Sequence, residues 1–241
     1  MTAHASVVCL HGWCCADWHF QPQVEFFKSD REIISIPWRK RLEARSSRVD
    51  LDLAARDIEV ACGEAGLSTP PILVGHSMGG MLAAMIARER RMPVAGIVVI
   101  DATWPFTPAA AEAFEAFIPV FEADFVSGAR DFFVNRLEHP ADDPEINQRV
   151  VDDVITADPR VAMDLFRDLA TPDRLPRAEQ VEVPILGVAS ALQFLDRKTL
   201  LSHASQAWYG QVAGCGHTIM LHAPQELNAM LKRFAESIDG I

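Results

Sequence analysis

The sequence predicts an α/β protein with a mainly parallel sheet of about six strands, helices on both faces and an inserted helical cap. Three observations predict it. Short apolar runs alternate with helix-period segments up to about residue 104, no strand-like run occurs in 105–182, and the alternation returns afterwards. We therefore expect a core built from 1–104 and 183–241, with the cap formed by 105–182.

The first part of the chain alternates strands and helices in short steps. The predicted strands are Val7–Leu10, Ile33–Pro37, Ile72–Val74 and Ile97–Ile100. Leu51–Ala65 has apolar residues at helical spacing and stops at Gly66, and Met78–Arg90 is a second helix that ends before Pro93.

The middle of the chain, from Pro105 to Glu182, is rich in Ala, Phe, Asp and Pro. We expect several helices here, among them one helix that carries a stripe formed by Phe114, Phe117, Phe121 and Phe125. The remaining elements are predicted as strands Pro184–Ala189 and Trp208–Val212 and a closing helix Pro224–Ile238.

Composition narrows the class of partner. The 241 residues include 22 Lys plus Arg and 33 Asp plus Glu, a net charge of -11, which argues against nucleic-acid binding. No apolar run approaches the ~20 residues of a membrane span. The polar N-terminus predicts no signal peptide. Five cysteines, an odd number without a CxxC pattern, predict a reduced, cytoplasmic protein with no metal site. We expect its partner to be a small-molecule substrate.

Gly75-His76-Ser77-Met78-Gly79 lies between a predicted strand and a predicted helix. A G-x-S-x-G pattern in this context forms a sharp turn that exposes the serine Oγ, and small flanking residues let strand and helix approach. The simpler alternative is a serine that only caps the helix. The strand before it and the helix after it favour the nucleophile.

Three motifs together resemble the α/β-hydrolase superfamily. They are Leu10-His11-Gly12-Trp13, Val74-Gly75-His76-Ser77-Met78-Gly79-Gly80 and Gly214-Cys215-Gly216-His217, and they follow the family's order along nearly the whole chain. The resemblance implies an α/β-hydrolase fold, with Ser77 as nucleophile and His217 as general base. It also implies an oxyanion hole formed by the amides of Met78 and Trp13, and no organic cofactor.

The sequence holds eight histidines, and His222 is the rival of His217 for the role of base. The glycines around His217 favour it, because they form a loop from which an imidazole can reach a distant serine. His11 and His76 are expected to pack beside the site. The other three considered, His4, His139 and His203, are expected at the surface.

The acid of the predicted triad is less clear. In hydrolases of the superfamily it usually follows the strand matched here by Pro184–Ala189, where this chain has Gln193. An amide cannot stabilise an imidazolium by charge. Asp101, at the end of the strand Ile97–Ile100, and Asp196 are the alternatives, although either could be a cap or a solvated charge. We prefer Asp101, which gives the triad Ser77–His217–Asp101.

The cap is expected to line the substrate pocket, since eight of the thirteen phenylalanines lie between Phe106 and Phe166. Trp104, Phe106 and His76 are predicted to bind substrate, together with Trp13. Pro37-Trp38-Arg39 continues into Lys40-Arg41, which form a small basic run with Arg45 and Arg48. We interpret this run as a solvated loop, with guidance of an anionic substrate as the alternative.

Three functions fit these residues. The first is a serine hydrolase that cleaves a carboxylic ester, thioester or lactone with an apolar or aromatic part through an acyl-enzyme on Ser77. The second is a cofactor-independent dioxygenase of 3-hydroxy-4-quinolone heterocycles, in which His217 and Asp101 act as base. Those enzymes resemble this chain in an early His-Gly-Trp-Cys, in Pro37-Trp38-Arg39 and in an acid placed like Asp101. The third is a non-enzymatic ligand receptor of the same superfamily.

Overall fold

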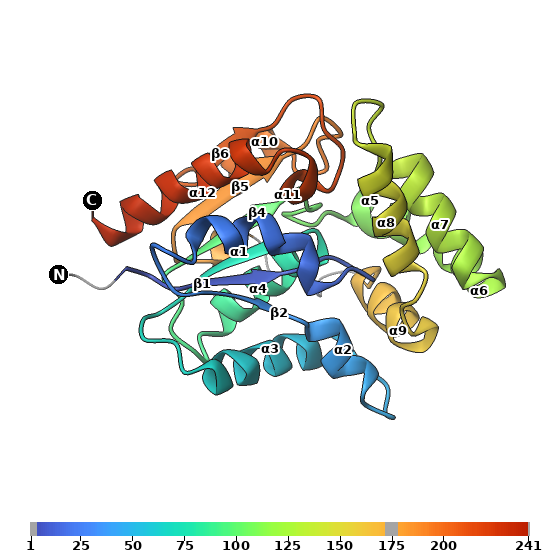
Figure 1. The fold of residues 1–241 in the computed structure, drawn as a ribbon. Helices are drawn as coiled ribbons and strands as arrows, with labels where there is room; N and C mark the ends of the chain where they lie inside the picture. The colour runs from blue at the N-terminus through green and yellow to red at the C-terminus, as the bar shows by residue number, and fades with distance from the viewer. Residues whose placement is uncertain (1–3, 172–177, 241) are drawn as a thin grey trace.

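The computed structural model describes residues 4–171 and 178–240. Its centre is one sheet of six parallel strands in the order β2-β1-β3-β4-β5-β6 (Figure 1). The strands are β1 (Val7–Leu10), β2 (Ile33–Ile36), β3 (Ile72–His76), β4 (Gly96–Ile100), β5 (Ile185–Ala189) and β6 (Trp208–Gln211). The predicted parallel sheet of about six strands is confirmed.

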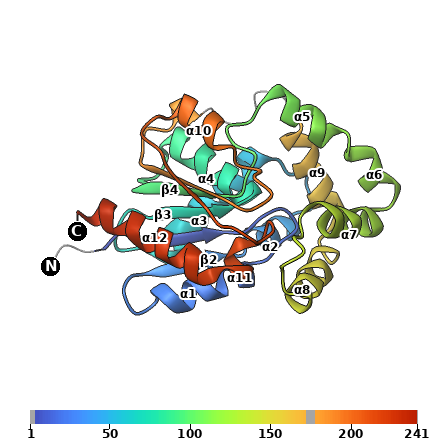
Figure 2. The same cartoon turned by 90° about the horizontal axis from the view of Figure 1, so that it is seen from above.

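Alternate residues of each inner strand pack into two separate cores. In β1, Val7 and Cys9 face one core and Val8 and Leu10 face the other, and all four are buried. Strands covered on both faces in this way are continuously apolar. Helices α1 and α12 cover one face of the sheet, and α3, α4 and α10 cover the other (Figure 2).

Three core helices, α3 (Leu51–Ala65), α4 (Met78–Glu89) and α12 (Pro224–Asp239), lie within one residue of their predicted limits. The sequence did not predict the other core helices, which are α1 (Gln21–Phe27), α2 (Trp38–Glu43), α10 (Arg197–His203) and α11 (Ile219–His222), or the 3-10 turns at Asp17–Phe20 and Ala178–Gln180. The α3 helix begins at an Asp50 side chain that accepts a hydrogen bond from the Leu53 amide and ends at Gly66, whose φ is 62°. In the described ranges, no helix is both long and apolar enough to cross a membrane.

Five helices are inserted between β4 and β5 and lie together at one end of the sheet (Figures 1 and 2). This helical insertion comprises α5 (Pro108–Glu115), α6 (Ile118–Ala123), α7 (Phe125–Arg136), α8 (Pro144–Val154) and α9 (Pro159–Leu169). The expectation that the described part of this segment contains helices and no strand is confirmed.

The predicted phenylalanine stripe on a single helix is wrong. Phe114 lies on α5, Phe121 on α6 and Phe125 at the start of α7, with Phe117 between the first two helices. Pro119 has no amide hydrogen, and in a continuous helix its ring would clash with the Glu115 carbonyl, so α5 ends there and Pro119 lies in the first turn of a new helix. The α7 helix then starts afresh at an Asp124 side-chain cap. The helical spacing of these phenylalanines is present in the sequence, but it continues across the ends of α5 and α6.

The interpretation of the basic run as a solvated loop is wrong in part, because Lys40 and Arg41 lie in a helix, whereas Lys40, Arg45 and Arg48 are exposed as expected. Trp38 to Arg41 lie in α2, and the Trp38 and Arg39 side chains are buried. Arg41 pairs with Asp57 at 2.6 Å, and Arg39 pairs with Asp153 at 3.4 Å. Each guanidinium therefore has a carboxylate partner within the protein, which leaves little unpaired charge for an anionic substrate.

The turn from β3 into α4 is pressed against the end of β1. A Cβ at Gly79 would overlap the carbonyl oxygen of Leu10, and a Cβ at Gly75 would overlap the carbonyl oxygen of Gly79. Both neighbours are backbone atoms that cannot rotate away. Glycine is therefore required at both positions, and the turn is held rigidly at the carboxyl end of the sheet.

These contacts predict opposite effects for two glycine-to-alanine substitutions. Gly79→Ala should lower the free energy of unfolding by about 1–3 kcal/mol, because the backbone must shift. Gly63→Ala should raise it by about 0.5–1 kcal/mol, since Gly63 lies within α3 with open space where a Cβ would point. Urea denaturation of the two variants measures both values. Equal effects of the same sign would contradict this account of the turn.

Candidate active site

One pocket opens where the strands end and the helical insertion begins. Its empty volume is about 540 Å³, including the part open to solvent. Loops after β1, β3 and β4 form its floor, and residues of α5, α7 and α9 form its wall. The side chains and backbone that line it belong to Gly12, Trp13, Cys15, His76, Ser77, Met78, Met81, Asp101, Thr103, Phe114, Phe132, Phe133, Leu137, Phe166, Leu169, Phe194 and His217.

Ser77 stands at the apex of the turn between β3 and α4. Its φ of 52° and ψ of -122° are sparsely populated for a residue with a side chain. The Ser77 amide donates a 2.8 Å hydrogen bond to the Ile100 carbonyl of the neighbouring strand, which fixes the turn on β4. The side chain therefore reaches the pocket from a strained backbone at the N-terminus of α4, as expected of a nucleophile elbow.

His217 and Asp101 meet beside Ser77. Nδ1 of His217 lies 2.8 Å from Oδ2 of Asp101, and both side chains are buried. A carboxylate only accepts, so Nδ1 carries the hydrogen and donates it. The other ring nitrogen, Nε2, is then unprotonated in the neutral ring and can accept a proton. The three residues proposed from the sequence as a triad thus line one pocket.

Asp101 is fully buried, and the backbone and side chain of Ser190 complete its hydrogen bonds. The Ser190 amide donates to Oδ1 and the Ser190 hydroxyl donates to Oδ2, each at 2.8 Å. A buried carboxylate needs such donors to remain charged. Sequence analysis missed Ser190. The available clue was its place directly after β5, the strand that neighbours β4.

The rival residues lie elsewhere. Asp196 is exposed and caps α10, accepting from the Thr199 amide at 2.7 Å. Gln193 is exposed, with a φ of 57°. His222 approaches Oδ1 of Asn147, a residue of α8, at 2.9 Å. None of these three residues is among those that line the pocket, in the part of the chain that the structure describes.

Two backbone amides lie beside the serine. Met78 is the first residue of α4, so its N–H has no partner within the helix. Gly12 is close enough that a Cβ there would lie 3.3 Å from Cβ of Ser77, which brings the chain at Gly12 and Trp13 alongside the nucleophile. The backbone at Met78 and at Gly12–Trp13 thus lies near Ser77, at the pocket that all these residues line.

The Trp13 ring is held by the helical insertion. Its Nε1 donates to the Ala162 carbonyl of α9 at 2.9 Å, and the ring packs on Phe121 and Phe166 with centroids 5.1 and 5.0 Å away. Trp104 and Phe106, also predicted to bind substrate, are not among the lining residues described. Trp104 is buried away from the pocket, and Phe106 packs behind Phe114.

His76, which was predicted to bind substrate, lines the pocket. Its Nε2 lies 3.0 Å from the His217 carbonyl, which only accepts, so Nε2 carries the hydrogen. Burial, with His217 nearby, lowers the pKa of His76 well below its usual value. The ring is therefore neutral and links the nucleophile turn to the loop that bears His217.

Cys15 is the other nucleophilic side chain at the pocket. Burial, together with the nearby Asp153 carboxylate, raises the pKa of its thiol to about 12. The thiolate is the reactive form of cysteine, and almost none is present at neutral pH. Cys15 is therefore held as an inert thiol, and Ser77, which shares the pocket with the His217–Asp101 pair, is the candidate nucleophile.

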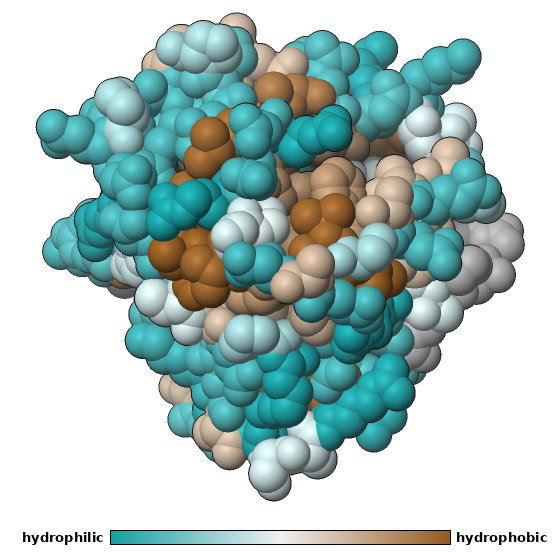
Figure 3. All heavy atoms as spheres, turned by 90° about the vertical axis from the view of Figure 1, so that its right-hand side faces the viewer, coloured by the Kyte–Doolittle hydropathy of each residue, from teal (hydrophilic) through white to brown (hydrophobic). Residues whose placement is uncertain are grey.

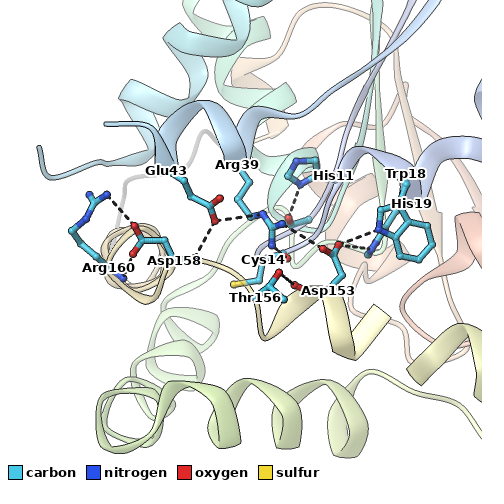
Figure 4. A network of polar contacts seen from close by, with 11 residues as sticks. His11, Cys14, Trp18, His19, Arg39, Glu43, Asp153, Thr156, Asp158 and Arg160 are labelled. Atoms are coloured by element: carbon cyan, nitrogen blue, oxygen red, sulfur yellow. Dashed lines mark hydrogen bonds and ion pairs between the residues drawn. The ribbon is translucent and has the colours of Figure 1, made fainter. Parts of the chain in front are cut away.

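A polar network ties the segment after β1 to the insertion (Figure 4). Arg39 donates to the Cys14 carbonyl at 2.7 Å and pairs with Asp153 of α8. Trp18 Nε1 donates to Asp153 at 3.1 Å. Burial opposes the charge of Asp153, but hydrogen bonding to His19 and the charge of Arg39 outweigh it and lower its pKa. Sequence analysis missed this network, which fixes the peptide next to Trp13.

The outer face of the insertion carries isolated apolar side chains. Val120, Val126 and Val134 of α6 and α7 are each more than two-fifths exposed. Figure 3 views this side of the molecule and shows apolar atoms gathered across its middle, with hydrophilic atoms around them.

The parallel sheet, the serine on a strand-to-helix turn and the paired histidine and aspartate define an α/β-hydrolase-type protein. Residues 7–230 match the model of the alpha/beta hydrolase family. The chain therefore belongs to that family.

Solved structures with the same fold carry varied activities. A thermophilic esterase from Thermogutta terrifontis superposes with a TM-score of 0.78 at 17% identity, over 99% of this chain and 92% of that one. An enol-lactonase from Burkholderia xenovorans gives 0.81 at 13% identity, with 96% and 91% covered. A bromoperoxidase from Bacillus anthracis gives 0.82 at 15% identity, with 97% and 93% covered. At these identities the similarity shows the fold, and the reaction must be argued from the residues.

Buried histidines around the site predict a loss of stability in acid. Burial lowers the pKa of His11 to about 3, against 6.5 for an ordinary histidine. As pH falls from 7 to 5, the unfolded chain binds a proton there and the folded chain does not, so folding loses about 2 kcal/mol at this residue. His11→Phe keeps a ring stacked on Trp38 and should reduce the pH 7-to-5 loss by about that amount.

Urea denaturation of the wild type and of His11→Phe at both pH values measures this difference. Comparing each protein with itself removes any effect of the substitution on stability at pH 7. The same loss in both proteins would mean that His11 is not held neutral by burial.

Proposed function

We propose that the protein is a serine hydrolase that cleaves carboxylic esters through an acyl-enzyme on Ser77. The observation that carries this proposal is the 2.8 Å contact between His217 and the buried Asp101, at a pocket that Ser77 enters from a strained turn. The fold of the hydrolase family supports it.

Acylation follows from the protonation states of these groups. Asp101 accepts from Nδ1 of His217, so Nε2 faces the substrate side as a base. Ser77 Oγ loses its proton to Nε2 as it forms a bond to the ester carbonyl carbon. The Asp101 carboxylate stabilises the resulting imidazolium, and the amides of Trp13 and Met78 donate to the oxyanion.

The same groups complete the reaction in reverse roles. The imidazolium of His217 gives its proton to the departing alkoxide as the carbon–oxygen bond breaks, which leaves an acyl group on Ser77. A water molecule then loses a proton to Nε2 and attacks the acyl carbon. The tetrahedral intermediate collapses to release the acid, and Ser77 regains its proton. A thioester or lactone follows the same steps.

The pocket wall supports an apolar acyl group. Phe114, Phe132 and Phe166 form it together with Leu137 and Leu169. No lysine or arginine is among the described lining residues, so a neutral, apolar or aromatic substrate fits best. Esterase and enol-lactonase activities among the similar structures are in keeping with this substrate class.

The position of Asp101 is the observation that favours a second candidate function, a cofactor-independent dioxygenase. Asp101 follows β4, as the corresponding acid does in the cofactor-independent dioxygenases that this chain resembles. In that reaction His217 would take a proton from a substrate hydroxyl, and Ser77 would only form a hydrogen bond. The strained turn at Ser77 favours the hydrolase.

Covalent labelling separates the two reactions. We expect a fluorophosphonate to add once to the wild type and not to Ser77→Ala, because only an activated serine attacks phosphorus. Intact-mass spectrometry reads the adduct directly. Folded wild type without an adduct, combined with oxygen uptake on hydroxyquinolones that survives Ser77→Ala, would replace the hydrolase with the dioxygenase.

Matched substitutions test the acid. Asp101→Asn should reduce kcat on a p-nitrophenyl ester by about 10³–10⁴-fold, because the amide neither fixes the required tautomer nor stabilises the imidazolium. Asp196→Asn is the control, and asparagine caps a helix as well as aspartate does. Comparable losses in the two variants would refute the assignment of Asp101.

A further inference from the structure

The loop that carries His217 is hydrogen-bonded to the helical insertion. The His217 amide donates to the Leu137 carbonyl at 2.8 Å, and the Gly216 amide donates to Oδ1 of Asp142 at 2.9 Å. Both acceptors belong to the segment between α7 and α8. Two consecutive peptide groups just before the imidazole are therefore fixed by a part of the chain that lies outside the sheet.

The Asp142 carboxylate is itself held in place. Its Oδ2 accepts from the His139 amide at 2.8 Å, and the Asp142 amide donates to the His139 carbonyl at 2.9 Å. This closed turn leaves the half-buried side chain little freedom. Oδ1 is thus presented to Gly216 in a fixed position.

Gly216 is shaped to this contact. A Cβ there would lie 2.5 Å from Oδ2 of Asp142 and 2.6 Å from the Leu137 carbonyl oxygen, so a larger residue would push the two segments apart. On the other side, His76 Nε2 donates to the His217 carbonyl at 3.0 Å. The backbone of His217 is held from both directions.

We propose that Asp142 is a positioning residue for the general base, a role that rests on the proposed function of His217. Asp101 sets the rotation of the imidazole, and Asp142 sets where the backbone beneath it lies. The helical insertion then has to be docked on the core for the base to reach Ser77. Asp142 does not touch substrate in this account.

Three variants test the proposal on a p-nitrophenyl butyrate assay. Asp142→Ala should lower kcat by about 10–100-fold and leave KM within about threefold, because a displaced base slows chemistry without altering the pocket wall. Asp142→Asn should be intermediate, since its amide oxygen still accepts from Gly216 but its NH₂ faces the His139 amide. Asp143→Asn is the matched control, because Asp143 caps α8 through the Glu145 amide at 2.8 Å and asparagine caps equally well.

A second readout does not depend on ester cleavage. The Nδ1–H of His217, bonded to Asp101, should give a protected downfield proton resonance that is lost in Asp142→Ala and kept in Asp143→Asn. Wild-type kcat together with this resonance in Asp142→Ala would overturn the positioning role, as would equal losses in Asp142→Ala and Asp143→Asn. The two proposals can also fail separately. If the resonance is lost in Asp142→Ala but kept in Asp143→Asn, and the wild type forms no fluorophosphonate adduct, the positioning role of Asp142 stands and the proposed hydrolase activity does not.

Discussion

The structure of the site depends on one buried charge, the carboxylate of Asp101. With no exposed surface, it must find its hydrogen-bond donors inside the protein, and it finds them in the Ser190 amide, the Ser190 hydroxyl and the ring of His217. These donors come from the end of β5 and from the loop after β6. A single carboxylate therefore joins the ends of the last three strands of the sheet and fixes the histidine at the same time.

The helical insertion contributes more than a wall to the pocket. Trp13 Nε1 donates to the Ala162 carbonyl, so α9 restrains the segment that carries one candidate oxyanion donor. Asp153 acts on the same segment through Arg39, which donates to the Cys14 carbonyl. The segment before α8 restrains the other side of the site through Gly216. Residues of the helical insertion thus both line the pocket and restrain the backbone on two sides of it.

Short sequence motifs were sufficient to predict the residues whose placement depends on their immediate neighbours in the chain. The strand-to-helix context of Ser77 and the glycines around His217 singled out two residues that line one pocket. The preference for Asp101 over Asp196 agrees with the hydrogen bond between Asp101 and His217. Trp104 and Phe106, which were predicted to bind substrate from their closeness in sequence, are not among the described lining residues, although Thr103 next to them is. Ser190 and Asp142 belong to no recognisable motif, and their partners lie 89 and 74 residues away, so their contacts become visible only in the folded chain.

The place of the acid on β4 has a consequence for how such a site can change. In relatives whose acid follows the strand matched by β5, that loop must keep its geometry to keep the reaction. In the loop after β5 of this chain, Ser190 donates hydrogen bonds to the Asp101 carboxylate. The residues that follow need not hold an acid: Gln193 is exposed to solvent and Phe194 lines the pocket. Residues 191–194, in contrast to the buried Leu195, are consequently a stretch in which side chains can be exchanged while Asp101 and His217 stay as they are.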